Sequence, residues 1–403
     1  MLKKFLSRFI RRNHYWRDIN FDELSELYTS MMFRSLALNL VGIFIPIYLY
    51  DLGFPVWQIM MFYACQLSIW TASLYGVAHL IAKVGPKHTM LASYVFMVMT
   101  MMLLASLKEL QWPLLMVAGF LALSNSLFFT AFHVDFSKVK HSEHGGKEVG
   151  WMYSMERAGA VLGPLIGGLV GFLIGAQYIF ATAILLLLAG ILPLLLSREP
   201  TATNQKLNFR ALKVSEIKHD LLAIGSMGVE NVVTLAVWPL FIGVYVFTEN
   251  PYIKLGSITS ISVLVSLFIA RAIGRTIDKN KGRSMLRLGA FSNAILHLFR
   301  PFTSSYLGAL GINLVNELVT PIYRMPATKG YYDAADEHPG NRIVYITGVE
   351  SVSAFGKAVF FTFATVVCYA FEASRPAFFV LFAVGALASI GIMQEKFKAL
   401  NPR

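Results

Sequence analysis

The sequence predicts an all-α integral membrane protein with twelve transmembrane helices in two pseudosymmetric six-helix halves. Three observations predict this fold: the composition, the number of long apolar stretches, and a repeat between the two halves of the chain. Of the 403 residues, 56% are hydrophobic and 14% are charged, and the mean hydropathy is +0.58. Soluble domains carry about 25% charged residues, and their cores stop growing near ~250–300 residues. The composition therefore argues against a long soluble enzyme and against a disordered chain.

Twelve stretches are long and apolar enough to cross a bilayer, which needs about 20 residues per helix. Their ranges are 27–50, 56–81, 87–107, 111–137, 148–174, 177–196, 219–248, 255–277, 284–302, 306–330, 343–370 and 376–394. Gly, Pro, Ser and Asn interrupt many of them, which transmembrane helices tolerate. A polar segment in the middle predicts a linker between the halves. The resulting organisation is an N-terminal segment (1–26), a first half (27–196), a cytoplasmic linker (197–218), a second half (219–394) and a tail (395–403).

The first 26 residues are basic and amphipathic. The segment MLKKFLSRFIRRNHYWR alternates basic and apolar residues and has no uninterrupted apolar core, so it does not look like a cleavable signal peptide. We expect a helix lying on the inner membrane surface; a matrix- or plastid-targeting peptide is the alternative. The two cysteines argue against a disulfide scaffold.

The net charge of +12 is explained by the positions of the basic residues rather than by a nucleic-acid partner. Of the 35 Lys and Arg residues, 26 fall in the termini or in loops expected on the same side of the membrane as the termini, and five lie inside spans. The other four, assigned to outer segments, are Lys108, Lys254, Arg300 and Arg375. This asymmetry follows the positive-inside rule. It predicts an inner cell membrane location with both termini cytoplasmic, next to anionic lipid.

The two halves repeat each other at an offset of about 195 residues. Three pairs of motifs are in register. The first pairs Gly76-x5-Ala82-Lys83-x-Gly85 with Gly274-Arg275-x2-Asp278-Lys279-x2-Gly282-Arg283, and the second pairs Gly146-x9-Glu156 with Gly340-x9-Glu350. The third pairs Ser30-x3-Arg34, which precedes Pro46, with Ser226-x3-Glu230, which precedes Pro239. Three matches in register argue for duplication of a six-helix unit. Paired halves of this kind are a transporter architecture whose binding site lies at the repeat interface.

With these motifs, the chain resembles the major facilitator superfamily over essentially its whole length. The family's loop motif is matched in the second half by Gly274, Arg275, Asp278, Lys279, Gly282 and Arg283, with one extra residue. The first half keeps Gly76, Lys83 and Gly85, but Ala82 replaces the acid. Span five carries a motif similar to that of the family's antiporters: Gly159, Gly163, Pro164, Gly167 and Gly168. Small residues let helices approach closely and Pro bends the span. The resemblance favours antiport over uptake.

Charged and polar residues inside the spans are candidates for the substrate and proton sites, because an ionisable group in hydrocarbon costs ~2.5–3.5 kcal/mol unless it faces a cavity or a partner. In the family's architecture, spans one, four, seven and ten line the cavity. The candidates are Arg34, Asn39, Asn125, Glu230, Asn313, Asn316, Glu317 and Arg324. The last four of these share one face of span ten with Thr320. Glu230 and Arg34 form a candidate pair, in which a carboxylate in a low-dielectric cavity exchanges its proton as the cavity alternates.

A second set of charges is expected to form clamps or gates. Its members are Glu156, Arg157, Glu350, Lys357 and Arg271, and the cytoplasmic loop motifs are assigned the same role. Counting from the helix ends places Glu156 and Glu350 about two turns from the cytoplasm. That position fits a gate, and a proton or substrate site is the alternative.

The sequence offers weak support for other chemistry. A cluster at the inner end of span four, His133, Asp135, His141, Glu143 and His144, could be a metal site, but its spacing favours a solvated loop. The sequence has no phosphate-binding Gly-x4-Gly-Lys-Ser/Thr loop and no His-Glu-x2-His helix. We therefore expect no catalytic residues, no metal and no cofactor, with a proton gradient as the energy source.

The sequence as a whole predicts a secondary active transporter that moves a small amphipathic organic solute by alternating access. Proton-coupled export by a monomer in the bilayer is the leading interpretation. Proton-coupled or facilitated uptake of a nutrient, such as a sugar or an organic anion, is the alternative within transport. A polytopic membrane enzyme and a transport-dead receptor or scaffold are remoter alternatives. Substrate identity does not follow from the sequence.

Overall fold

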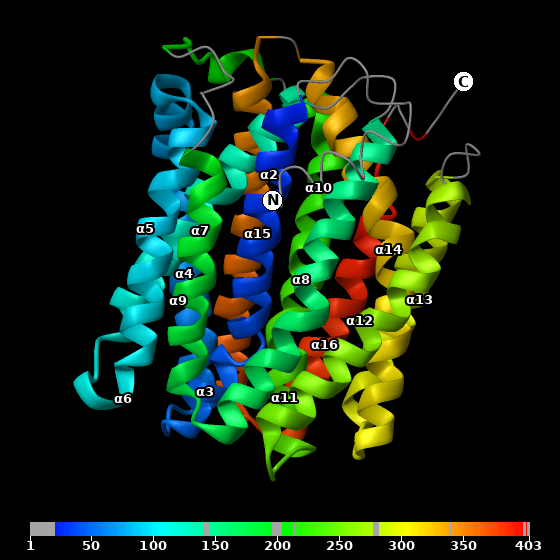
Figure 1. Ribbon diagram of the computed structural model, residues 1–403. Helices are drawn as coiled ribbons and strands as arrows, with labels where there is room; N and C mark the ends of the chain where they lie inside the picture. The colour runs from blue at the N-terminus through cyan, green and yellow to red at the C-terminus, as the bar shows by residue number, and fades with distance from the viewer. Residues whose placement is uncertain are drawn as a thin grey trace.

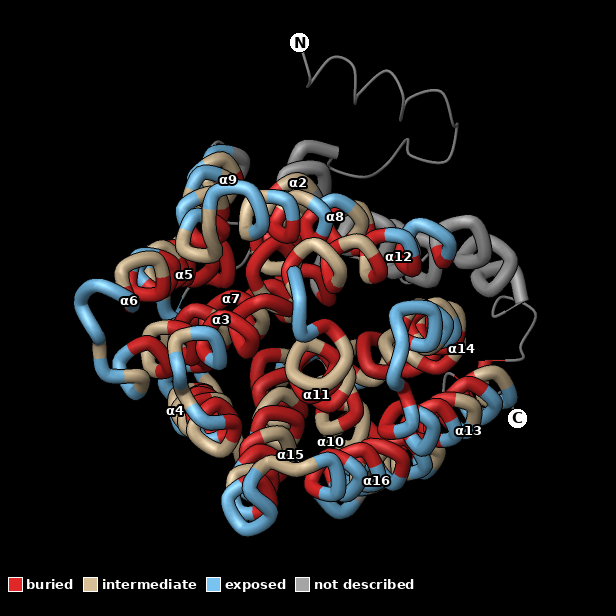
Figure 2. The backbone as a smooth tube through the Cα atoms, turned by 90° about the horizontal axis from the view of Figure 1, so that it is seen from below, coloured by how far each residue is buried: buried red, intermediate tan, exposed pale blue. Residues whose placement is uncertain are grey.

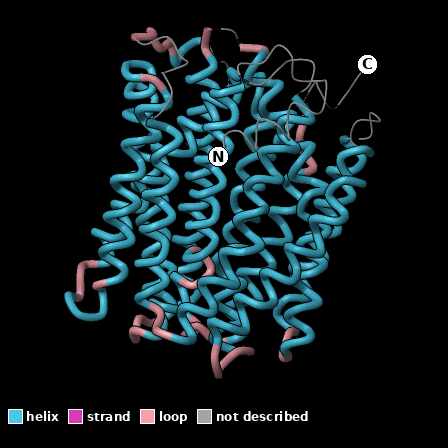
Figure 3. The backbone as a smooth tube through the Cα atoms, in the orientation of Figure 1, coloured by secondary structure: helices cyan, strands magenta, loops and turns pink. Residues whose placement is uncertain are grey.

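The computed structural model describes residues 21–139, 145–195, 204–212, 214–276, 282–338, 340–397 and 400. In this part of the chain the regular structure is helical and contains no strand (Figure 3). The first half contributes α2 (Phe21–Val41), α3 (Ile45–Asp51), α4 (Val56–Val84), α5 (Pro86–Ala105), α6 (Leu107–Leu110), α7 (Leu114–Val139), α8 (Gly145–Leu173) and α9 (Gln177–Leu195). The second half contributes α10 (Val214–Val232), η2 (Val233–Val237), α11 (Trp238–Tyr245), α12 (Pro251–Thr276), α13 (Gly282–Phe299), η4 (Arg300–Phe302), α14 (Tyr306–Asp336), α15 (Arg342–Ala370) and α16 (Arg375–Ile392), and the 3-10 turn η1 (Phe209–Ala211) lies between the halves.

The helices form a bundle whose outer surface suits lipid. Seven helical segments among the described residues are long and apolar enough to cross a membrane: Thr29–Asp51, Val56–Val84, Pro86–Ala105, Leu114–Ser137, Ile217–Tyr245, Arg342–Ala370 and Arg375–Ile392. Buried residues face the middle of the bundle and exposed ones face outward (Figure 2). Large apolar side chains such as Leu173, Leu185 and Leu307 lie on the exposed surface. These features identify an integral membrane protein, and the order of the long helices agrees with the predicted twelve-helix fold when the segments α2–α3 and α10–η2–α11 are each counted as one span.

The first helix of each half is interrupted at a matching depth. In the first half, α2 gives way to a turn at Gly42, and α3 then begins with Pro46 in its first turn. In the second half, α10 passes through the five-residue π-helix η2, and α11 begins with Pro239 in its first turn. Pro near a helix start is tolerated because its missing N–H has no intrahelical acceptor there. Pro46 thus lies near the start of α3, whereas Pro239 lies just after η2 within one continuous helical segment and lacks the N–H that would bond back into it.

The two halves meet along two helix pairs, α4 with α15 and α8 with α12, which lie side by side in Figure 1. At the second pair the backbones approach closely: a Cβ atom added at Gly168 would lie 2.7 Å from the carbonyl oxygen of Tyr252, and one added at Gly256 would meet the carbonyl of Pro164. Gly159 and Gly163 make similarly close contacts with α2 inside the first half. The glycine motif of span five is therefore where α8 packs on both of its neighbours.

One end of the bundle, which we call the linker end, carries the connection between α4 and α5 and the segment 204–212. Gly85 joins the two helices with φ +90, a conformation that favours glycine. The amide of Gln205 donates to the carbonyl of Ala82 over 2.9 Å, and the Phe209 ring lies 5.0 Å from that of Tyr75. The described part of the linker is thus fixed to α4.

Candidate functional site

A cavity of about 460 Å³ lies between the two halves. This volume is in the range of sites for small organic ligands. Side chains of α2, α4, α7, α10, α14 and α15 line it, including seven residues predicted from the sequence: Arg34, Asn39, Asn125, Glu230, Arg324, Glu350 and Lys357. Much of the remaining wall is aromatic and includes Tyr63, Trp70, Phe128, Phe129, Tyr331 and Phe361. The cavity is therefore amphipathic, with charges set in apolar walls.

Arg34 is the fully buried cation on the wall formed by the first half. Its Nη2 donates to the Ser124 hydroxyl over 3.1 Å, and its guanidinium lies 3.9 Å from the centre of the Phe128 ring. Both contacts come from α7, which α5 supports through a hydrogen bond from the Ser124 hydroxyl to the carbonyl of Ser93. Among the described residues, the Nε and Nη1 groups of Arg34 have no hydrogen-bond partner. Two of the three nitrogens of this guanidinium are therefore buried without a hydrogen-bond acceptor among the described residues.

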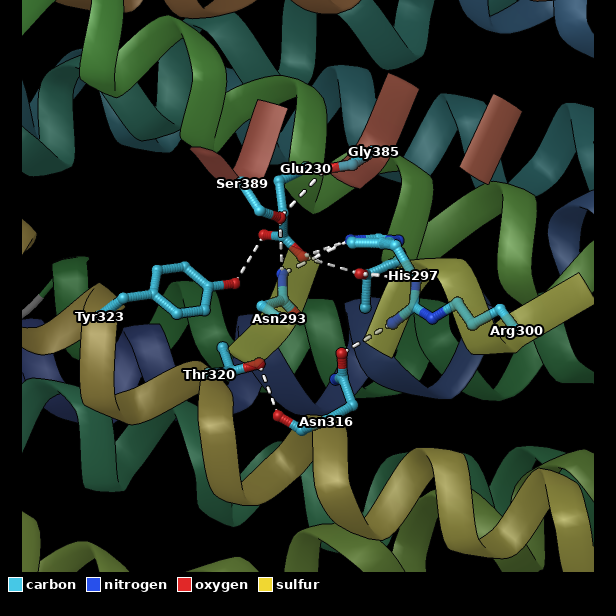
Figure 4. A network of polar contacts seen from close by, with 10 residues as sticks. Glu230, Asn293, His297, Arg300, Asn316, Thr320, Tyr323, Gly385 and Ser389 are labelled. Carbon is cyan, nitrogen blue, oxygen red and sulfur yellow. Dashed lines mark hydrogen bonds and ion pairs between the residues drawn. The ribbon is translucent and has the colours of Figure 1, made fainter. Parts of the chain in front are cut away.

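Glu230 is the buried carboxylate at the equivalent position of the second half, and it lies in a polar network (Figure 4). Oε2 accepts a hydrogen bond from the Tyr323 hydroxyl over 2.6 Å. Oε1 accepts one from the Thr234 hydroxyl over 2.8 Å and lies 3.5 Å from Nε2 of His297. Glu230 and Arg34 were predicted to pair with each other, but the structure gives each of them partners in its own half.

Arg300 is the cation of the same network. It donates from Nη2 to the side-chain oxygen of Asn316 over 2.7 Å and from Nη1 to the Thr234 hydroxyl over 3.0 Å. The sequence assigned Arg300 to an outer segment but did not predict that its side chain is fully buried in the bundle. It extends from the turn η4 at the end of α13 into the bundle, where it also lies over the Trp238 ring.

The polar stripe of α14 contacts three different neighbours instead of lining the cavity as a unit. Asn313 accepts a hydrogen bond from the Trp238 indole N–H over 2.6 Å, and Asn316 belongs to the Arg300 network. Glu317 forms an ion pair across the halves with Arg157 of α8. Arg324 reaches the cavity, whereas the expectation that Asn313, Asn316 and Glu317 line it is not met. A helix face is wide enough to touch several neighbours, so residues of one polar stripe can contact different helices.

Contacts between the halves close the cavity towards the linker end. His133 of α7 lies 3.6 Å from the carboxylate of Glu350 and hydrogen-bonds the Tyr332 hydroxyl over 2.6 Å. Arg342 donates to the carbonyl of Ser137 over 2.7 Å. His133 was assigned to a solvated loop, but it is part of a helix and faces the cavity. A layer that joins α7 to α14 and α15 is what a gate at this end requires.

Other contacts join the halves towards the opposite end. The Tyr252 hydroxyl of α12 donates to the carboxylate of Asp51 over 2.7 Å. Between α4 and α15, the rings of Tyr63 and Phe361 stack with centres 5.0 Å apart. Near the middle of the same two helices, in the cavity wall, Lys357 of α15 lies 5.3 Å from the centre of the Trp70 ring. Cross-half contacts thus lie on both sides of the cavity.

Several predicted gate residues fall outside the described part of the chain. They are Asp278 and Lys279, together with the side chains of Glu156, Arg271 and Arg275. Three residues of the weak metal candidate, His141, Glu143 and His144, also lie outside the described residues. Of the loop motifs that are described, Gly76 and Lys83 are exposed, and Gly282 is buried near Leu400. Arg283 forms a salt bridge with Glu395 over 3.1 Å. Burial raises the pKa of Glu395, and the positive charge of Arg283 opposes that effect.

Sequence reasoning missed much of the Glu230 network. Asn293, His297 and Arg300 are spaced i, i+4 and i+7 and share one face of α13 and η4. The Asn293 amide donates to the Ser389 hydroxyl over 3.0 Å, which ties α16 into the network. The shared helix face of these residues in span nine is the same kind of signal as the polar stripe of span ten.

Comparisons with known proteins agree with this architecture. The profile of the family described as Major Facilitator Superfamily matches residues 27–322. The "Multi-drug resistance efflux pump PmrA" of two strains of Streptococcus pneumoniae is 26% identical over 291 residues, which cover 67% of this chain and 71% of that protein. The crystal structure of the transporter FucP in the outward conformation has a TM-score of 0.66 at 13% identity and covers 92% of this chain and 96% of that one. A second structure, of a variant of the E. coli "Fucose:proton symporter, FucP", gives a TM-score of 0.61 at the same identity and coverage; both likenesses concern the fold alone.

Proposed function

The chain belongs to the Major Facilitator Superfamily, and from this premise we propose that it exports a small amphipathic organic solute in exchange for protons, by alternating access. The observation that carries the proposal is the cavity of about 460 Å³ between the halves, with aromatic walls and buried charges. The superfamily consists of transporters, so an enzymatic activity is set aside. We propose that the protein lies in the inner cell membrane with cytoplasmic termini, on the basis of its charge asymmetry. We further propose that it acts as a monomer.

Alternating access requires the contacts on each side of the cavity to break in turn. On the linker side these are the His133 contacts with Glu350 and Tyr332. On the opposite side the Tyr252–Asp51 hydrogen bond joins the halves. Each set consists of a few polar contacts, and net contributions of about 0.5–1.5 kcal/mol per hydrogen bond are small enough to exchange. The glycine contacts of α8 with α12 supply a close, smooth surface about which the halves rock.

Proton coupling is assigned to Glu230. Its carboxylate faces His297 and Asn293 of α13, Tyr323 of α14 and Thr234 of η2, while Arg300 lies one hydrogen bond further away. Because Glu230 also lines the cavity, a solute or water entering from one side can change its protonation. Glu317, paired with Arg157 across the halves, is the second carboxylate whose protonation would release a contact between the halves. The export direction rests on the similarity to a multidrug efflux pump.

Flux into proteoliposomes under an imposed pH gradient tests the proposal. For a panel of anionic, neutral and cationic aromatic solutes, antiport predicts accumulation in acid-inside liposomes, whichever way the protein is inserted. Accumulation in alkaline-inside liposomes, above that in protein-free ones, would indicate symport and uptake instead. We expect Glu230→Gln to reduce gradient-driven flux at least tenfold, whereas the exposed Glu249→Gln serves as the control. If Glu230→Gln and Glu317→Gln both keep full gradient-driven flux, the coupling assignment is wrong.

A further inference from the structure

We propose that the cavity binds an organic anion with an aromatic body, and that Arg34 holds the anionic group. The inference deepens the proposed function, since it names the class of solute that the same cavity takes. It rests on the proposed function for the movement of the solute, but the binding itself can be tested without any gradient.

Arg34 is a buried cation with unsatisfied hydrogen-bond donors. Its side chain is fully buried and lines the cavity. Within the described part of the chain, no salt bridge joins Arg34 to a carboxylate, and its Nε and Nη1 lack acceptors. A buried charge without a counter-ion is costly. Charge-assisted hydrogen bonds to a carboxylate, sulfonate or phosphate oxygen would satisfy these donors.

The carboxylates that line the cavity already contact protein side chains. Both oxygens of Glu230 accept hydrogen bonds inside the second half. Glu350 faces His133 and interacts electrostatically with Lys357, a second cation on the wall. The cavity therefore presents a cation that has donors to spare and carboxylates that are committed to protein partners. A cationic solute would find the buried cation Arg34 in the cavity wall and no carboxylate free to pair with it among the described residues.

The walls around Arg34 define the rest of the solute. Phe128 lies against the guanidinium, Phe129 lies 6.0 Å from it, and Trp70 stacks on Phe129 with ring centres 6.0 Å apart. The indole N–H of Trp70 is buried and has no acceptor among the described residues. Aromatic rings prefer stacked or edge-on neighbours, and this wall offers both. An aromatic ring system bearing one anionic group matches the arrangement of cation, donor and rings.

Binding of three solutes that share one ring system tests the charge preference directly. In detergent micelles without a pH gradient, equilibrium dialysis compares 1-naphthoate, 1-naphthamide and 1-naphthylmethylammonium on the purified full-length protein. We expect 1-naphthoate to bind at least tenfold more tightly than the amide, and the ammonium compound to bind most weakly. Equal affinities for all three, or a preference for the cation, would overturn the proposal.

Variants assign the preference to Arg34. Arg34→Gln is expected to lower the affinity for 1-naphthoate at least tenfold and to change the affinity for 1-naphthamide little. Arg375→Gln, which removes an exposed arginine of α16, should leave both affinities unchanged. If Arg34→Gln does not fold, Lys357→Gln should lower naphthoate affinity by a smaller factor of about two to five. An unchanged naphthoate preference in a folded Arg34→Gln protein would overturn the assignment.

The same measurements separate this inference from the proposed function. Selective naphthoate binding without gradient-driven flux of any solute would sustain the anion site and overturn the coupling. Gradient-driven flux of a cation, together with no naphthoate preference in micelles, would sustain proton-coupled export and overturn the anion site.

Discussion

The two halves carry opposite charges at equivalent positions of their first helices, Arg34 in α2 and Glu230 in α10. Both side chains are buried and both line the cavity. Glu230 is surrounded by hydrogen-bonding partners from its own half, whereas Arg34 has one serine and a set of rings. Equivalent positions of the repeat therefore both hold a buried charged side chain, but the two side chains differ in sign and in the groups that they contact. One half keeps its charge inside a network, and the other presents its charge to the cavity.

The largest expected effect comes from removing Arg300 of the second half, with the removal of Arg34 of the first half as the comparison. Arg300→Leu leaves the Glu230 carboxylate without its nearby cation and Asn316 without its donor, so we expect the free energy of unfolding to fall by about 3–5 kcal/mol. Arg34→Leu leaves no described carboxylate without its cation, so we expect the free energy of unfolding to fall by at most about 1 kcal/mol. Denaturant titration in micelles, followed by tryptophan fluorescence, measures both. Equal losses in the two variants would remove the proposed difference between the halves.

The surface on which the halves meet gives the next effect. Gly168→Ala places a methyl group 2.7 Å from the carbonyl oxygen of Tyr252, and overpacking of this kind costs about 1–3 kcal/mol. We expect a similar loss of stability and slower gradient-driven flux. Gly119→Ala is the matched control, because its added Cβ would meet nothing within 4 Å. Normal flux in a folded Gly168→Ala protein would show that the halves do not need this close approach to rock.

The smallest effect is expected for the ion pair between the halves. A double-mutant cycle with Arg157→Gln and Glu317→Gln should give a coupling energy of about 1 kcal/mol, because both side chains are partly accessible, at 10% and 16%. The four proteins of the cycle are compared by the same denaturant titration. A coupling energy of zero would mean that Arg157 and Glu317 act independently of each other.

Sequence reasoning reached the fold because the signals for it are long and redundant. Twelve apolar stretches and three pairs of repeated motifs do not depend on any single side chain. It also drew attention to Arg34, Glu230, Glu350 and Lys357 as charges inside spans, and all four side chains line the cavity. The residue boundaries assigned to the two halves and the linker stay predictions.

The partners of those charges were harder to predict from the sequence. A span shows which residues share a face, but not which neighbouring helix that face meets. Glu317 pairs with Arg157 of the other half, and Arg300 turns from a helix end back into the bundle. Both arrangements depend on the relative rotation of helices far apart in the chain, which the sequence of one helix does not encode.

The π-helix η2 sets the rotational phase between the two ends of the seventh span. Each residue of an α-helix advances the side chains by about 100°, and a π-turn holds one residue more than an α-turn. The extra residue between Glu230 and Trp238 therefore offsets the face that carries the carboxylate from the face that carries the indole. Deleting one residue within Val233–Val237 would turn Glu230 by about 100° relative to Trp238. The carboxylate could then no longer meet His297 while the Trp238 N–H meets Asn313.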